Sequence, residues 1–194
     1  MTTCRKEDKK CRILDAGIEV MYKHGYNGTG VKDIVCAAGI PKGSFYNYFE
    51  SKEAFAIMAL DQMFESTANN PAFTSREKPP LERLIAFFES GAKKAQSGGY
   101  LLGCFLGNIT QEMSDVNEPI RLKSDFLLSR LTALIEDLLI EAQEKGDLAR
   151  DRDAAKLAQF IFNAWEGTLT RMKAAKNYNA FDSFLTELPF LLRS

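Results

Sequence analysis

A chain of 194 residues is long enough to bury a core of its own, while a net charge of −1 and a pI near 6.0 give no overall indication of nucleic-acid binding. This net charge is unevenly distributed along the chain. Residues 1–52 carry nine Lys and Arg against six Asp and Glu, a net charge of +3, which leaves −4 for the remaining residues. The longest apolar run, near residues 100–106, is too short and too glycine-broken to span a bilayer, and no targeting pattern is visible. We therefore expect a cytoplasmic protein with no membrane partner.

Three helices are predicted in residues 1–52. The first covers residues 6–24, the second follows Thr29, and the third begins near Pro41 after a turn at Gly39, which can take the positive φ that reverses the chain. Phe45 and Phe49 lie four residues apart and should face the second helix. The opposite face of the third helix then carries Lys42, Gly43, Tyr46 and Asn47. An ordinary helical hairpin would share this pattern, but a basic, hydroxyl-bearing face opposite buried aromatics in two turns is typical of a recognition helix.

At these residues the chain resembles the TetR family of bacterial transcription regulators. The family signature is matched at Thr29, Ile34, Ala38, Gly39, Gly43, Tyr46, Tyr48, Phe49 and Lys52. One position departs from it, since Gly30 stands where the family commonly has Ser or Thr, and a helix-capping hydroxyl is lost. The resemblance implies an all-α fold with an N-terminal three-helix helix-turn-helix DNA-binding head, residues 1–52, and a C-terminal helical effector-binding and dimerisation body, residues 53–194.

The family likeness also implies roles for individual residues of the head. It assigns phosphate contacts to Thr29, Tyr46, Tyr48 and Lys52, and it places Lys42, Gly43, Ser44 and Asn47 nearest the base edges, with Lys32 in the same DNA-binding set. The expected function is that of a sequence-specific regulator, a repressor that binds a pseudo-palindromic operator of double-stranded DNA as a homodimer. A small-molecule or electrophile signal in the body is expected to release it.

The remaining residues are predicted to form the helical body. A fourth helix opens at Ser51 and Lys52 and fades by Asn69, a loop covers residues 70–80, and a fifth helix ends at residues 97–99. Further helices are expected over residues 102–115 and 118–145, the latter stopping at Gly146. An eighth follows a cap at Asp151 or Asp153, and the last spans residues 178–192.

The last two helices are apolar on more than one side, which favours a partner surface in addition to a core. TetR-like proteins form a four-helix dimer interface from the last two helices of each subunit. The interface candidates are therefore Phe160, Ala164, Trp165, Phe184 and Leu188. Completing the core of a monomer would explain the same pattern.

Cys104 is the main candidate for signal sensing, because a thiol in the first turn of the helix expected from Leu102 would be stabilised as a thiolate. This segment, with Trp165 and Lys173, resembles the branch of the family that contains the repressor of the N-ethylmaleimide reductase operon, where a cysteine and a lysine so placed are associated with electrophile sensing. A buried cysteine that acts as a small hydrophobe is the alternative. The aromatic candidates for lining an effector pocket are Tyr100, Phe105, Phe126, Phe162 and Trp165, which core filling would explain equally well.

An enzyme is the competing class. His24 is the only histidine and lies beside Gly25 in the basic head, so a cysteine hydrolase would lack a base near its thiol. No phosphate-binding loop or metal signature is present, and the four cysteines, expected as thiols, have no metal spacing. We expect no enzyme activity, cofactor or metal. The alternatives are a helical dimeric small-molecule-binding protein and a thiol enzyme, each without DNA function.

Overall fold

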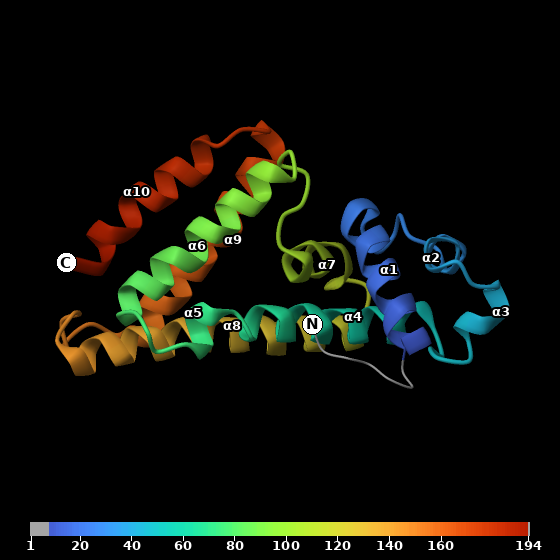
Figure 1. Ribbon diagram of the computed structural model, residues 1–194, viewed down its shortest axis with the longest axis horizontal. Helices are drawn as coiled ribbons and strands as arrows, with labels where there is room; N and C mark the ends of the chain where they lie inside the picture. Colours follow the sequence, from blue (N-terminus) through green and yellow to red (C-terminus); the bar gives the residue numbers. More distant parts are fainter. Residues whose placement is uncertain (1–7, 194) are drawn as a thin grey trace. The chain divides into compact units, whose positions relative to one another are not determined.

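The computed structural model describes residues 8–193, which form ten helices and no strand (Figure 1). These residues divide into two compact units. One comprises the residues up to Met63 together with Phe105–Asp125, and the other comprises Phe64–Cys104 with the residues from Phe126 onward. The all-α prediction is confirmed. The functional division expected at residue 52 stays a prediction, because compactness alone does not report on function.

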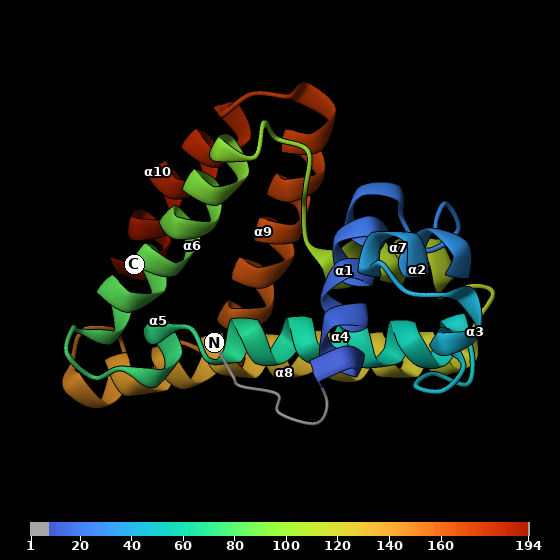
Figure 2. The same cartoon turned by 45° about the vertical axis from the view of Figure 1, so that its right-hand side comes forward.

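The first unit is built on α1 (Asp8–His24), α2 (Val31–Ala38), α3 (Lys42–Phe45), the first turns of α4 (Lys52–Ala68) and α7 (Phe105–Met113). In both views α1 lies beside α2 and α7 (Figures 1 and 2). The ring of Tyr22 in α1 lies 5.3 Å from that of Phe105 in α7. The core of this unit is apolar and largely aromatic, and it includes Ile13, Met21, Ile34, Phe45, Phe49 and Phe55. Its three N-terminal helices therefore fold onto a common apolar centre.

The second unit contains α5 (Pro71–Thr74), α6 (Pro80–Ser97), most of α8 (Glu118–Lys145), α9 (Ala154–Ala175) and α10 (Asn179–Arg193). Trp165 of α9 is buried, and its ring centroid lies 5.0 Å from that of Phe88 in α6 and 5.3 Å from that of Phe184 in α10. Gly91 permits this approach, since a Cβ there would lie 2.8 Å from the indole. One aromatic cluster thus joins α6, α9 and α10.

Most predicted helices are present, with shifted ends. Asp153 caps α9 through Lys156 N at 3.0 Å, and Gly146 follows α8 with φ of +81°, as expected. The helix expected from Leu102 starts at Phe105, so its first turn does not include Cys104. The start predicted at Lys6 lies outside the described residues.

The segment predicted as a loop after Asn69 contains the short helix α5. Its residues Asn70 and Pro71 form a helix start, because the Asn70 side chain accepts a hydrogen bond from Ala72 N at 2.9 Å and Pro71 occupies the first turn. The loop prediction was therefore wrong for residues 71–74.

Candidate functional site

The turn between α2 and α3 follows directly from its sequence. Gly39 has φ of +65° and ends α2, while Ile40 N donates to Val35 O at 3.0 Å, which satisfies a carbonyl at the end of the helix. Pro41 then precedes α3 with φ of −63°. A residue with a Cβ would be strained at position 39, so the glycine fixes the angle at which the third helix leaves the second.

Aromatic packing holds α3 in place from beneath. Phe45 and Phe49 are buried, and their ring centroids lie 5.9 Å and 5.0 Å from that of Phe55 in α4. Gly17 in α1 makes room for this cluster, because a Cβ at that position would lie 2.4 Å from the Phe55 ring. The helical segment at positions 42–45 is only one turn long, so its position depends on this packing more than on helix propensity.

The outward face of α3 and of the turn after it carries most of the candidate DNA-contacting residues. Lys42, Gly43 and Asn47 are exposed, and Tyr46 is 55 % exposed despite its large ring. Ser44 and Tyr48 are half-buried, and Lys32 is exposed on α2. The structure therefore brings together a basic, amide and hydroxyl surface within one short segment, which suits phosphate and base-edge contacts.

Thr29 and Lys52 are turned toward the protein. The Thr29 side chain is 1 % exposed, and its hydroxyl donates to Gly25 O at 2.7 Å. The Lys52 ammonium donates to Tyr26 O at 2.9 Å and Thr29 O at 3.1 Å, and it lies 4.0 Å from the centre of the Tyr26 ring. Burial lowers the pKa of Lys52, and the charge of Glu112 opposes that shift. Both residues hold the α1–α2 turn in this conformation.

The missing hydroxyl at Gly30 is compensated from within α2. The Asp33 carboxylate accepts a hydrogen bond from Gly30 N at 2.8 Å, and this carboxylate in the first turn also complements the helix dipole. Thr29, which bonds to Gly25 O, does not supply the cap.

Glu112 is a supporting residue that the sequence analysis missed. From α7 its carboxylate accepts hydrogen bonds from Tyr26 N at 3.2 Å and Asn27 N at 3.0 Å. Gly25, with φ of +74°, allows this contact, because a Cβ there would lie 2.1 Å from the carboxylate. Glu112 therefore holds the turn that leads into α2, although no local sequence signal connects residues this far apart.

The candidate effector residues occupy different surroundings. Phe105 is buried beside Tyr22, whereas Phe126 is 54 % exposed. Phe162 and Trp165 are buried, and Lys173 is half-buried. Tyr100 is half-buried with φ of +59°, and its carbonyl accepts a hydrogen bond from Lys176 Nζ at 3.1 Å. The burial of these residues thus differs from one to the next, and their assignment to an effector site stays a prediction.

Cys104 is half-buried, forms no disulfide, and hydrogen bonds with the carboxyl group of Glu166 in α9. Burial raises the pKa of Glu166, and the bond with Cys104 opposes that rise. The other carboxyl oxygen, Oε1, is buried and has no hydrogen-bond partner among residues 8–193.

The other cysteines differ from one another. Cys36 is free and exposed on α2, and Cys11 is disulfide-bonded, so the expectation of thiols was wrong for Cys11. Among the described residues no group of three or more His, Cys, Asp or Glu side chains could hold a metal ion. Within the same part of the chain no helix combines the length and the apolar character needed to cross a membrane.

Four of the five interface candidates line one groove between α9 and α10. The groove has a volume of about 650 Å³, and its lining includes Phe160, Ala164, Phe184 and Leu188. Phe160 is 60 % exposed, and Phe190 on the same groove is 63 % exposed. Trp165 instead points into the aromatic cluster of its own unit. The groove is thus an apolar surface large enough to receive side chains of a partner.

Comparison with known proteins agrees with this geometry. Residues 13–57 match the family described as bacterial regulatory proteins, tetR family, and residues 80–188 match the tetracyclin repressor-like C-terminal domain. The HTH-type transcriptional repressor DhaR of Mycobacterium sp. (strain GP1) is 34 % identical over 176 residues, covering 90 % of this chain and 87 % of that protein.

Solved structures give the same result. A regulatory protein TetR from Rhodobacter sphaeroides superposes with a TM-score of 0.86 at 30 % identity, covering 93 % of this chain and 96 % of that one. The reduced form of E. coli NemR also gives a TM-score of 0.86, at 24 % identity and with 93 % and 95 % of the two chains covered. The chain belongs to the TetR family of DNA-binding transcriptional regulators.

Proposed function

We propose that this protein represses transcription by binding a pseudo-palindromic DNA operator as a homodimer, and that a signal received by the body releases it. The observation that carries the proposal is the exposed face of Lys42, Gly43, Tyr46 and Asn47 above the buried Phe45. Two such faces, about 34 Å apart in a symmetric dimer, would read two successive major grooves. Repression, rather than activation, is supported by the name of the relative DhaR. Such a protein acts in the cytoplasm by binding, without catalysis.

The DNA-binding residues fall into two groups by their exposure. We assign direct contacts to Lys32, Lys42, Gly43, Ser44, Tyr46, Asn47 and Tyr48, which are exposed or half-buried. Thr29 and Lys52 instead position the α1–α2 turn through their hydrogen bonds to backbone carbonyls, and any phosphate contact from them would require these bonds to rearrange.

The α9–α10 groove supports the homodimer. Phe160 and Phe190 expose most of their rings to solvent in the isolated chain, which is unfavourable unless a second surface covers them. Burial of these rings against the same groove of a second copy would produce the symmetric interface that a palindromic operator requires.

Operator binding can be tested by fluorescence anisotropy with the DNA upstream of the encoding gene. We expect saturable binding that weakens steeply between about 50 and 200 mM salt, because bound phosphates release counterions. Asn47→Ala should relax the preference at one base position and cost about 1–3 kcal/mol. Gln96→Ala, which removes an exposed amide from α6, is the matched control and should leave binding unchanged. Binding that is insensitive to Asn47→Ala at every operator position would contradict the assignment.

Signal release can be tested with N-ethylmaleimide as the electrophile. If Cys104 is the sensor, alkylation releases the operator from the wild-type protein but not from Cys104→Ser. Cys36→Ser is the necessary companion variant, because Cys36 is an exposed thiol on α2, where alkylation could disturb DNA binding directly. Release that persists in Cys104→Ser and disappears in Cys36→Ser would assign the effect to the head and remove Cys104 from the mechanism.

A further inference from the structure

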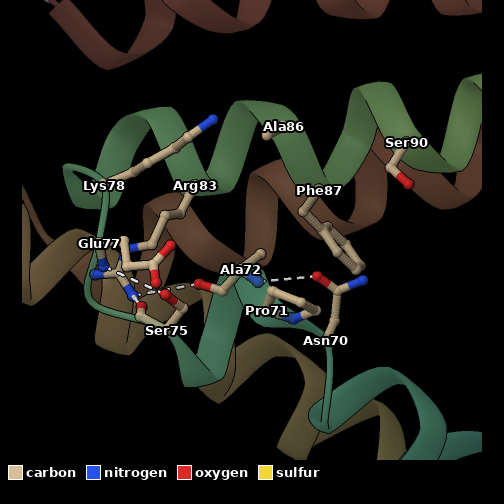
Figure 3. Close-up of a pocket in the computed structure, with 10 residues that line it drawn as sticks. All are labelled: Asn70, Pro71, Ala72, Ser75, Glu77, Lys78, Arg83, Ala86, Phe87 and Ser90. Atoms are coloured by element: carbon tan, nitrogen blue, oxygen red, sulfur yellow. Dashed lines mark hydrogen bonds between the residues drawn. The ribbon is translucent and has the colours of Figure 1, made fainter.

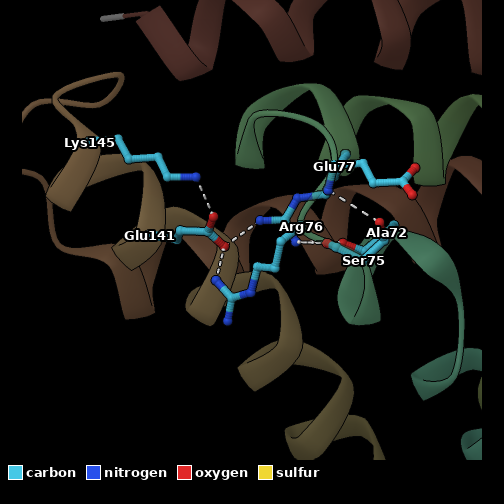
Figure 4. Close-up of polar contacts among 7 residues, drawn as sticks. Ala72, Ser75, Arg76, Glu77, Glu141 and Lys145 are labelled. Atoms are coloured by element: carbon cyan, nitrogen blue, oxygen red, sulfur yellow. Dashed lines mark hydrogen bonds and ion pairs between the residues drawn. The ribbon is translucent and has the colours of Figure 1, made fainter.

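A cluster of three cations surrounds one carboxylate in the second unit. Glu141 of α8 accepts hydrogen bonds from Arg76 at 2.6 Å, from Lys145 at 2.7 Å, and from Arg83 (Figure 4). Burial by itself raises the pKa of Glu141, but the hydrogen bonds from Lys145 and Arg83 outweigh this and hold the pKa below its ordinary value. The carboxylate is therefore ionised at neutral pH, and the cluster still has more positive than negative charge.

Arg83 of α6 is the most buried of these cations. Its side chain is 4 % exposed, and one terminal nitrogen donates to Ser75 O at 2.7 Å and Ala72 O at 3.3 Å. The Nε of this guanidinium is buried without a hydrogen-bond partner in the described part of the chain. An unpaired buried donor is unfavourable, more so when it belongs to a charged group, but this nitrogen is inaccessible here, so a ligand beside Arg83 would reach it only if the side chain shifted.

Arg83 also lines a pocket of about 310 Å³ between α5 and α6 (Figure 3). The apolar part of its lining consists of Pro71, Ala72, Ala86 and Phe87, and the Phe87 ring is supported by Phe73 at a centroid distance of 4.8 Å. The polar part consists of Asn70, Ser75, Glu77, Lys78, Arg83 and Ser90. A volume at the lower end of the range for ligand sites, with an aromatic wall and a few polar groups, suits a small organic molecule.

The charges around the pocket favour an anion. The lining carries Lys78 and Arg83 against Glu77, and the adjoining ion-pair cluster adds Arg76 and Lys145 against Glu141, so positive charges outnumber negative ones in both groups. Lys78 extends outward from the start of α6 in Figure 3, where its long side chain can turn toward a bound anion at little cost. An uncharged ligand of the same shape would leave the excess positive charge unchanged, although its carbonyl oxygen could still accept a hydrogen bond from Arg83.

We propose that this pocket binds a small aromatic carboxylate. The ring lies against Phe87 and the neighbouring apolar side chains, and the carboxylate is directed to Arg83 and Lys78 and accepts from the guanidinium. This binding site is formed within the second unit alone, so it exists whether or not the protein binds the operator proposed above.

The test is isothermal titration of the whole protein, without DNA, using benzoate and its uncharged analogue benzamide. We expect saturable binding of benzoate and binding of benzamide weaker by about tenfold or more, which corresponds to one charge-assisted contact. Ala86→Trp should fill the pocket from its exposed edge and weaken benzoate binding by at least about tenfold. Its control is Ala133→Trp, at an exposed position of α8 that does not line the pocket.

Lys78→Ala removes a rim charge without disturbing buried groups and should weaken benzoate binding by about three- to fivefold, whereas Lys93→Ala, at an exposed position of α6 outside the pocket, should not. Thermal unfolding of each variant verifies that the fold is retained. Absence of saturable benzoate binding, equal affinity for benzamide, or equal affinity of Ala86→Trp and Ala133→Trp would each overturn the proposal.

Discussion

Two glycines of the helix-turn-helix segment have different physical roles, and replacing each by alanine separates them. Gly39 has φ of +65°, and no other group lies within 4 Å of the position that a Cβ would occupy, so Gly39→Ala meets backbone strain alone. We expect it to lower the free energy of unfolding by about 1–2 kcal/mol. Gly43 lies in α3 and also has open space around a Cβ, so Gly43→Ala should raise the free energy of unfolding by up to about 1 kcal/mol.

Gly43→Ala should weaken operator binding even though it is expected to stabilise the protein. If the glycine permits close approach to the DNA backbone, the added methyl group weakens operator binding by about tenfold, or 1.4 kcal/mol, in a protein that is more stable. Urea unfolding measures the stability, and fluorescence anisotropy measures the affinity. A Gly43→Ala protein that is more stable and binds the operator as tightly as the wild type would refute close approach at this position.

Three other perturbations address the supporting contacts. Glu112→Ala removes the acceptor of two backbone N–H groups and should lower the free energy of unfolding by about 1.5–3 kcal/mol in urea titrations, whereas Gln111→Ala, at the exposed neighbouring position, should not. Burial raises the pKa of the Glu166 carboxyl group above its ordinary 4.5. The folded state therefore binds the carboxyl proton more tightly than the unfolded state does. As the pH rises from 4.5 through the folded pKa, the free energy of unfolding decreases. The stability gained by Glu166→Gln relative to wild type should therefore increase as pH rises above 4.5, and a pH-independent difference would contradict this. Phe160→Glu should convert a dimer to monomers in sedimentation velocity, whereas Phe126→Glu, at a similarly exposed ring outside the groove, should not.

The turn and the start of the third helix could be predicted from sequence because their requirements are local, whereas the two helical turns expected from Pro41 are reduced to the single turn of α3, Lys42–Phe45. Gly39 supplies the positive φ, Pro41 sets the start of the next helix, and the four-residue spacing of Phe45 and Phe49 determines which face is buried. None of these features depends on residues far along the chain. The same reasoning failed at Asn70, where an N-cap followed by proline was interpreted as loop composition although it starts a helix.

The contacts that orient the turn could not be predicted, because they join residues distant in sequence. Glu112 lies 86 residues from Tyr26, and the buried state of Arg83 depends on Glu141, 58 residues away. Hydrophobic periodicity reports which face of a helix is buried, but it does not report which polar side chain reaches across to another helix. Such pairs become visible only when the helices are positioned in space.

The residues of this segment therefore have two distinct roles. The signature residues Thr29, Lys52 and Phe49 face inward and hold the turn and the packing beneath α3, while Lys42 and Asn47, which are not signature positions, face outward. Substitution of an inward residue should change stability and operator affinity together, because the geometry of the whole segment depends on it. Substitution of an outward residue should change affinity or base preference alone. A match to the signature thus reports mainly on the scaffold, and operator specificity depends on the few outward side chains that the scaffold leaves free to vary.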